Sequence, residues 1–179
     1  LLQGTSLRST QECCREHLFL THPDAFLAGI SDAYVQLIRD LLFRKEDAHP
    51  RQPMEDAARR SMGIHMSRLV SAARTDPDVV GGRYSTACYI TDSWPSLLYL
   101  AYKYVKDPKA ALLANTNLGG DNAHRGAVLG VILGLATGRT VDAFFHRLKD
   151  RQAIEDEITA LLGLSEEPRE EGEEWDDRR

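Results

Sequence analysis

Residues 115–138 read NTNLGGDNAHRGAVLGVILGLATG, and this stretch decides the fold class. A glycine pair and an aspartate run directly into an apolar segment, in which glycine recurs at every fourth position, 126, 130, 134 and 138. Each glycine inside a helix costs about 1 kcal/mol relative to alanine. A stripe of glycines is typical of a helix that another helix backbone approaches closely. We therefore expect a rigid, buried helix that packs in this way.

The rest of the chain also follows helical periodicity, and strand alternation is nearly absent. Helices are predicted over residues 10–19, 24–41, 54–74 (interrupted by a glycine), 93–105, 108–118, 121–137 and 140–162, with a loop at 75–84. Their predicted starts are Ser9 or Thr10, a capping box from Thr21 to Asp24, Asp92 or Ser93, Asp107-Pro108, and Thr140. We expect an all-α, compact multi-helix domain of about seven helices over residues 1–164, followed by a disordered acidic tail over 165–179.

Charge and composition exclude several classes of protein. Residues 165–179 hold eight acidic and three basic residues, which account for the whole net charge of −5 and leave a neutral body. A neutral body gives no reason to expect binding to nucleic acid or to a membrane surface. The longest apolar run, 127–136, is far shorter than the roughly 20 residues that span a bilayer. Three cysteines without metal-ligand spacing favour reduced thiols, and so a cytoplasmic protein.

The first turn of the glycine-containing helix concentrates the charged residues of this segment. Asp121 stands at the helix N-terminus, where capping and the helix dipole already explain a carboxylate; a ligand of Mg²⁺ is the alternative. His124 and Arg125 add positive charge where the dipole is also positive, which is unfavourable. Pairing with Asp121, or with a bound anion such as phosphate, would remove that cost. An exposed surface residue is an equal alternative for Arg125.

Other polar and aromatic residues have structural explanations. His22 lies beside a proline in the first turn of its helix, where a loop hydrogen bond accounts for it. Asn115 and Asn117 suit the turn that ends a helix before two glycines. Trp94 and Tyr89 are interpreted as core residues, with platforms on which a base could stack as the alternative. No catalytic triad, phosphate-binding loop, zinc site or dinucleotide fingerprint is present in the sequence.

Three segments together resemble the ADP-ribosylglycohydrolase family, which includes crystallin-like relatives. Residues 117–121, NLGGD, precede a helix of small residues and are similar to the family's N-x-G-G-D-T-D-T segment. Residues 92–99, DSWPSLLY, are similar to its S-x-P-x-A-L-Y helix start, and residues 20–23, LTHP, to its S-x-x-T-H segment. Their order and rough spacing agree over residues 10–162.

The resemblance implies an all-helical fold, two bound Mg²⁺ ions and hydrolysis of the glycosidic bond between ADP-ribose and a protein side chain or small acceptor. It would make Asp121 a ligand of the metal pair and His22 a contact to ADP-ribose, and it would place residues 88–90 near the ligand. His124 would be a further donor for metal or phosphate. The second aspartate and last threonine of the family segment, which also serve the metals, are here Ala123 and His124. Mg²⁺ favours oxygen over imidazole nitrogen.

The resemblance covers only the later part of the family fold. The family's G-D-x-x-G start, T-D-D motif and S-N-G segment have no counterpart in this sequence, which also begins without methionine. We expect a fragment, a processed product or an incomplete gene product. Because half a fold exposes apolar helix faces, we also expect poor solubility of the isolated chain.

Three hypotheses about function follow. The first is a Mg²⁺-dependent hydrolase acting on ADP-ribosylated substrates. The alternative is a catalytically inactive family member that binds ADP-ribose or serves a structural, crystallin-like role. A helical interaction module without a ligand ranks third.

Overall fold

The computed structural model describes residues 6–139 and 141–166, and these residues form ten helices and no β-strand. The prediction of an all-α fold is confirmed. Contacts divide the chain into two compact units, one running to Val141 and the other beginning at Asp142. No described helix combines the length and the hydropathy needed to cross a membrane.

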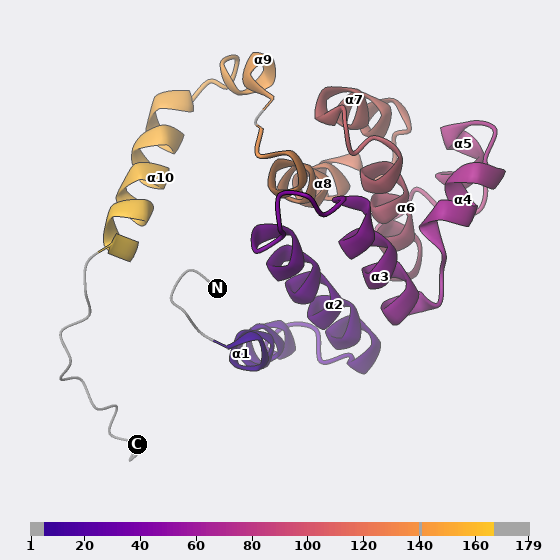
Figure 1. Ribbon diagram of the computed structural model, residues 1–179, viewed down its shortest axis with the longest axis horizontal. Helices are drawn as coiled ribbons and strands as arrows, with labels where there is room; N and C mark the ends of the chain where they lie inside the picture. Colours follow the sequence, from indigo (N-terminus) through magenta and orange to yellow (C-terminus); the bar gives the residue numbers. More distant parts are fainter. Residues whose placement is uncertain (1–5, 140, 167–179) are drawn as a thin grey trace. The chain divides into compact units, whose positions relative to one another are not determined.

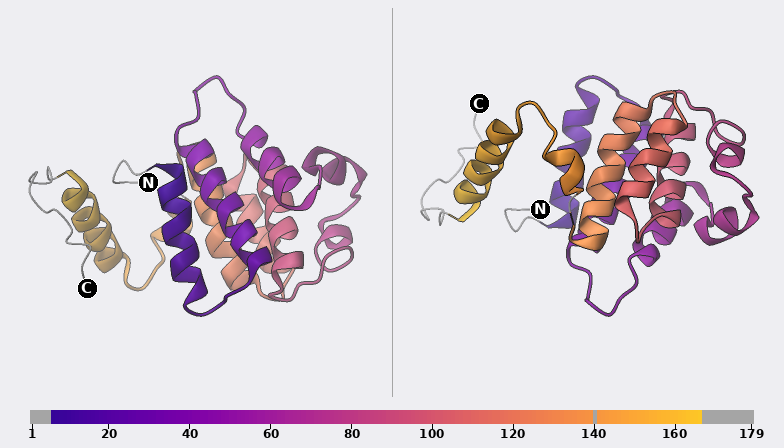
Figure 2. Two further views of the ribbon diagram at one scale, coloured as in Figure 1. Left: turned by 90° about the horizontal axis from the view of Figure 1, so that it is seen from below. Right: turned by 90° about the horizontal axis from the view of Figure 1, so that it is seen from above.

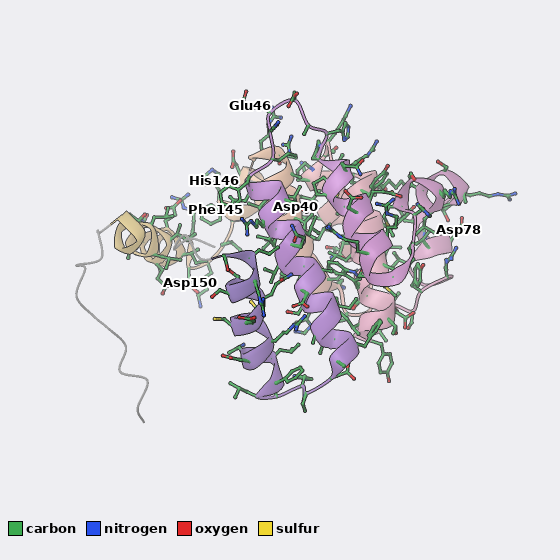
Figure 3. The ribbon with its side chains drawn as sticks, turned by 60° about the horizontal axis from the view of Figure 1, so that its bottom comes forward. Asp40, Glu46, Asp78, Phe145, His146 and Asp150 are labelled. Atoms are coloured by element: carbon green, nitrogen blue, oxygen red, sulfur yellow. The ribbon has the colours of Figure 1, made fainter. Side chains whose placement is uncertain are left out.

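The first unit contains the helices that build the site. They are α1 (Leu7–Phe19), α2 (Ala25–Leu42), α3 (Arg51–Met62), α4 (Met66–Ala72), α5 (Asp76–Val79), α6 (Ile90–Lys103), α7 (Pro108–Asn117) and α8 (Asn122–Thr137). Helix α2 packs against α1, α3 and α8, and α6 packs against α3, α4, α7 and α8 (Figures 1 and 2). The connection between α2 and α3 projects from the helices with Glu46 at its tip (Figure 3).

Helix α6 is the centre of this unit. Every residue from 94 to 101 is buried, so the helix is enclosed on all sides. A helix that is apolar all round belongs in a core rather than on a surface. Burial of each large apolar side chain contributes roughly 1.5–3 kcal/mol. The packing of α3, α4, α7 and α8 around α6 therefore dominates the stability of the unit and fixes where their ends meet.

The structure confirms one predicted helix start and corrects another. Asp107 caps α7, because its side chain accepts a hydrogen bond from Ala110 N at 2.9 Å and Pro108 occupies the first turn. Asp24 is itself the cap of α2 and accepts from Leu27 N at 2.7 Å. The capping box that was predicted to begin three residues earlier is therefore wrong: the helix starts at the aspartate.

Two further starts were predicted too late. Helix α1 begins after Ser6, whose hydroxyl accepts from Ser9 N at 3.1 Å. Helix α6 begins after Tyr89, ahead of the predicted caps. Asp92 lies inside the first turn and accepts from Ser85 N at 3.2 Å, so it holds the preceding loop instead of capping the helix.

Several predicted helices are divided. The helix predicted over 54–74 is α3 and α4, separated at Gly63, which ends α3 with a left-handed φ of 65°. The predicted loop 75–84 contains the one-turn helix α5, which Thr75 begins. In the second unit the helix predicted over 140–162 is α9 (Asp142–Phe145) and α10 (Arg151–Glu166). Thr140 and most of the predicted tail, 167–179, lie outside the described residues.

Among the described residues, no other helix closely approaches the glycine stripe of α8. A Cβ at Gly126 would lie 2.9 Å from Asn115 Nδ2, which is a side-chain atom. At Gly130, Gly134 and Gly138 a Cβ would meet nothing within 4 Å. The expectation of backbone packing along this stripe is therefore wrong. Helix α8 enters the core through its opposite face, which carries Leu129, Ile132, Leu133 and Ala136.

Candidate functional site

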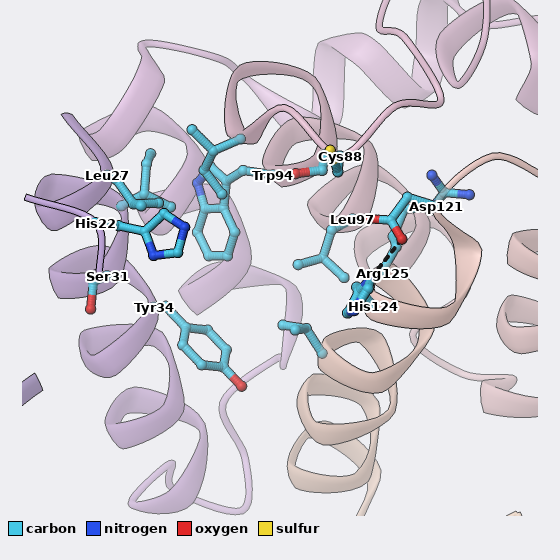
Figure 4. Close-up of a pocket in the computed structure, with 14 residues that line it drawn as sticks. His22, Leu27, Ser31, Tyr34, Cys88, Trp94, Leu97, Asp121, His124 and Arg125 are labelled. Carbon is cyan, nitrogen blue, oxygen red and sulfur yellow. Dashed lines mark hydrogen bonds and ion pairs between the residues drawn. The ribbon is translucent and has the colours of Figure 1, made fainter. Parts of the chain in front are cut away.

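A pocket of about 610 Å³ lies between α2, α6 and α8 of the first unit (Figure 4). Its volume falls within the range of roughly 300–1,000 Å³ that is usual for small-molecule sites. The apolar part of its lining comes from Leu27, Ile30, Ile90, Leu97 and Val128. The polar side chains that line it come from three separate stretches of the sequence, which only the fold brings together.

The wall formed by α2 and α6 carries an aromatic pair. Tyr34 and Trp94 meet edge to face, with ring centroids 6.2 Å apart and planes at 86°. Trp94 is 3% exposed, as its interpretation as a core residue predicts, and its Nε1 donates to Ser61 Oγ at 2.9 Å. Burial raises the pKa of Tyr34, so its hydroxyl stays protonated and is available as a donor. Tyr34 lies within the helix predicted over residues 24–41 but was not among the predicted site residues; a hydroxyl on the apolar face of that helix is the signal that could have identified it.

His22 lines the same pocket from the turn that precedes α2. Its Nδ1 lies 2.8 Å from Thr21 Oγ1, so the predicted local hydrogen bond is confirmed. The bond fixes the ring, and Figure 4 shows the ring beside Trp94 at the edge of the pocket. His22 therefore makes a local hydrogen bond and also lines the pocket. Tyr89, by contrast, is 69% exposed, and its interpretation as a core residue is wrong.

Asp121 and His124 form the opposite wall. Asp121 is the first residue before α8, but its side chain makes no capping hydrogen bond to the helix. Its Oδ1 instead accepts a 2.6 Å hydrogen bond from His124 Nδ1, drawn as a dashed line in Figure 4. This hydrogen bond, together with the negative charge of Asp121, raises the pKa of His124. The predicted pairing of the histidine with the aspartate is confirmed, and the capping interpretation of Asp121 is wrong.

The glycine pair positions Asp121 against the loop that precedes α6. Gly119 and Gly120 have left-handed φ values of 68° and 64°. Asp121 N donates to Thr86 O at 2.9 Å, and a Cβ at Gly120 would lie only 2.2 Å from the same oxygen. The loop that contains Thr86 continues to Cys88, which also lines the pocket. Cys88 and Ile90 therefore line the same pocket as Asp121, and their contact with a ligand stays a prediction.

Arg125 is buried, so its interpretation as an exposed surface residue is wrong. It is 4% exposed, and its Nε donates to Asn115 Oδ1 at 2.6 Å. Its Nη2 donates to Gly119 O at 2.9 Å, while Nη1 has no partner among the described residues. Burial lowers the pKa of Arg125, and the negative charge of Asp121 acts in the opposite direction. The signal for its burial is present in the sequence: positions 125, 129, 132 and 136 share one helix face.

Asn115 links the end of α7 to the beginning of α8. It is 2% exposed, and besides its bond to Arg125 its Nδ2 donates to Asn122 O at 2.8 Å. It was predicted to serve the turn at the end of α7. The structure shows a wider role, because the buried amide joins both sides of the turn that presents Asp121.

The available donors do not fit a pair of Mg²⁺ ions. Asp121 is the carboxylate that lines the pocket, and Ala123 offers no ligand in the position where the family has a second aspartate. Within residues 6–139 and 141–166 there is no group of three or more histidine, cysteine, aspartate or glutamate side chains that could hold a metal ion. Asp121 and His124 remain the donors nearest to such a site, and the buried guanidinium of Arg125 adds a positive charge beside them.

Comparison with known proteins identifies the family. Residues 5–171 match the family described as ADP-ribosylglycohydrolase, which is most of the chain. The chain belongs to the ADP-ribosylglycohydrolase family. No curated protein and no solved structure matches it. ADP-ribosylglycohydrolases are hydrolases that act on ADP-ribosylated substrates, and the resemblance seen in the three sequence segments is thereby confirmed.

Proposed function

We propose that the pocket binds the ADP-ribosyl group and that the protein hydrolyses the bond between ADP-ribose and an acceptor side chain or small molecule. One observation supports this above the others. The three sequence segments that resemble the family, far apart in the chain, contribute His22, Trp94 and Asp121 to the walls of one pocket.

The pocket has features that suit ADP-ribose. Its apolar walls exclude water around a planar or sugar group, and the positive N-terminus of α8 with His124 suits a pyrophosphate. The Tyr34 hydroxyl and the His22 ring are the polar groups of the facing wall. In this proposal they orient the ligand between α2 and α8.

Asp121 is the residue that we assign to the chemistry. A carboxylate beside the anomeric carbon stabilises the positive charge that develops there as the glycosidic bond breaks. It can take a proton from the attacking water, whose oxygen bonds to the anomeric carbon, and give that proton to the departing acceptor. Its hydrogen bond to His124 orients the carboxylate. Dependence on Mg²⁺ stays a prediction, because Asp121 and His124 alone would not hold two ions.

A non-catalytic ADP-ribose-binding role is the second candidate. The observation that favours it is the replacement of the second aspartate by Ala123, an exposed residue that leaves the site with a single carboxylate. A protein of this kind would keep the pocket and its affinity for ADP-ribose but would not turn over a substrate.

One set of assays separates these functions. ADP-ribose release from arginine- and serine-linked ADP-ribosyl peptides is measured with Mg²⁺, with Mn²⁺ and with EDTA, alongside calorimetry with free ADP-ribose. Asp121→Asn is expected to lower the rate of release about 100-fold or more, since general acid–base catalysis contributes about that factor. The matched control is Asp47→Asn, in the exposed connection between α2 and α3, which should leave the rate unchanged.

The outcomes are distinct. Release by the wild type and by Asp47→Asn, but not by Asp121→Asn, supports the hydrolase. Binding heat without release under any metal condition supports the non-catalytic candidate. If the folded protein shows neither release nor binding heat, both proposals fail.

A further inference from the structure

The buried charge of Arg125 is not explained by helix packing. The residue is 4% exposed, and its guanidinium donates to the neutral oxygens of Asn115 and Gly119, at 2.6 Å and 2.9 Å. Its third nitrogen, Nη1, is buried without a partner in the described part of the chain. An apolar side chain of similar length would fill this space without the cost of burying a charge. The charge itself therefore calls for an explanation.

Asp121 supplies the opposite charge. Asp121 and Arg125 are four positions apart, which places them on the same side of the first turn of α8 (Figure 4). The negative charge of Asp121 partly offsets the lowering that burial imposes on the pKa of Arg125. The bond from Arg125 to Gly119 O also holds the turn that presents Asp121. The arginine thus acts on the aspartate both by its charge and through the backbone.

The same turn offers little to a pair of cations. Ala123 carries no donor, and His124 uses Nδ1 for its bond to Asp121. No metal-binding group of three donors exists among the described residues. A fixed positive charge beside the carboxylate repels any divalent ion that Asp121 binds, more strongly because the guanidinium is shielded from water.

We infer that Arg125 is a positioning residue that supplies positive charge to Asp121 from inside the protein, in place of a divalent cation. The pocket then binds ADP-ribose without a pair of metal ions. This inference rests on the proposed function, because it concerns how the same pocket holds its ligand. Arg125 is among the residues that line the pocket, but its guanidinium bonds to Asn115 and Gly119, so in this inference it acts through Asp121 and the Gly119 turn.

Two variants of Arg125 separate the effect of its charge from the effect of its side-chain shape. Arg125→Met removes the charge and keeps a long flexible side chain, whereas Arg125→Lys keeps the charge. Arg44→Met is the matched control, because Arg44 also has a buried unpartnered nitrogen and donates to a helix carbonyl, Ala136 O, at 3.2 Å, but does not line the pocket. Thermal melting confirms that each variant is folded. ADP-ribose affinity is measured by calorimetry in EDTA and in Mg²⁺, and Mn²⁺ affinity is measured by electron paramagnetic resonance without ADP-ribose.

The wild type and Arg44→Met are expected to bind ADP-ribose equally well in EDTA and in Mg²⁺. Arg125→Lys keeps the charge but loses the forked hydrogen bonds to Asn115 and Gly119, so it should bind ADP-ribose more weakly than the wild type, to the same degree in both buffers. Arg125→Met should bind it about tenfold more weakly in EDTA and regain affinity with Mg²⁺, while its affinity for Mn²⁺ rises about tenfold, because the repulsion is gone. A residue that served only to pack α7 against α8 would lower both affinities together. The gain in metal affinity is therefore specific to the charge.

Two results would overturn the inference and leave the proposed function standing. One is binding of ADP-ribose by the wild type only when Mg²⁺ is present; this comparison needs no variant, and so decides the matter even when Arg125→Met does not fold. The other is an unchanged Mn²⁺ affinity in folded Arg125→Met. If the folded wild type binds no ADP-ribose in either buffer, the proposed function fails together with the inference.

Discussion

Alanine at Gly120 should disable the site, whereas alanine at the neighbouring Gly119 should not. Both glycines have left-handed φ values, 64° and 68°, so alanine at either position costs about 1–2 kcal/mol of backbone strain. They differ in their surroundings. A Cβ at Gly119 meets nothing within 4 Å, but a Cβ at Gly120 would lie 2.2 Å from Thr86 O. Ordinary contact begins at 3.4 Å, so the turn must move by about 1.2 Å, the difference between the two distances.

That movement separates Asp121 N from Thr86 O, and the lost hydrogen bond costs about 1 kcal/mol more. Gly120→Ala is therefore expected to lower the free energy of unfolding by about 2–3 kcal/mol, and Gly119→Ala by about 1–2 kcal/mol. A displacement of about 1 Å at a catalytic group can cost about 100-fold in rate. ADP-ribose release should fall by that factor in Gly120→Ala and stay close to the wild-type rate in Gly119→Ala.

Urea unfolding followed by circular dichroism and the peptide-release assay measure the two effects in the same preparations. The pair of variants controls for backbone strain, because only the contact with Thr86 differs. Equal losses of rate in the two variants would refute the reasoning that the close contact at Gly120 positions Asp121.

Three further predictions concern the same unit. Asp76 accepts hydrogen bonds from two tyrosine hydroxyls and a lysine ammonium, so Asp76→Ala should lower the free energy of unfolding at pH 7 by about 2–3 kcal/mol. Burial alone would raise the pKa of Asp76, but these hydrogen bonds lower it. The loss of stability in Asp76→Ala should therefore become smaller when urea unfolding is measured at pH values below about 3.9, where the carboxylate becomes protonated. A loss of stability that does not change with pH would contradict this. An NMR titration should give His124 a pKa above 6.5, and Asp121→Asn should bring this pKa back towards 6.5. The pairing of His124 with Asp121 stabilises the fold below pH 6.5, and this contribution is lost as the pH rises through the raised pKa. Gly130→Ala and Gly134→Ala should each raise the free energy of unfolding by about 1 kcal/mol, and a loss of stability would mean that these open positions are covered.

Local signals in the sequence predicted the helices and the pairing of Asp121 with His124. Periodicity is a property of each segment, so it identified α2, α6, α7 and α8 without knowledge of their neighbours. A histidine three positions after an aspartate is a contact within one helix turn, and it was found at 2.6 Å. Helix boundaries were less accurate, because Asp92 could cap a helix or bind a loop and the sequence does not distinguish these roles.

The pocket could not be predicted from any single segment of the sequence, because residues from separate helices form it. Tyr34 and Val128 line the same pocket only because α2 packs against α8, which in turn packs against α6. The glycine stripe was misread because spacing shows that one helix face is bare, but not whether a neighbour lies against it. The exposed alternative for Arg125 failed for a different reason: it considered the charge of the side chain, although the position of the residue in the helical period indicated burial. The cytoplasmic location expected from the cysteines stays a prediction.

Helix α6 is both the centre of the hydrophobic core and a wall of the pocket, since Trp94 and Leu97 belong to both. Folding and ligand binding are therefore linked through one element. A ligand at one hundred times its dissociation constant adds about 2.7 kcal/mol to the free energy of unfolding. A melting-temperature screen of nucleotides and nucleotide sugars can thus rank ligands for this pocket without a substrate and without any assumption about catalysis. By the same linkage, a core substitution beneath Trp94 that populates the unfolded state lowers the apparent affinity of the pocket for every ligand by the same factor.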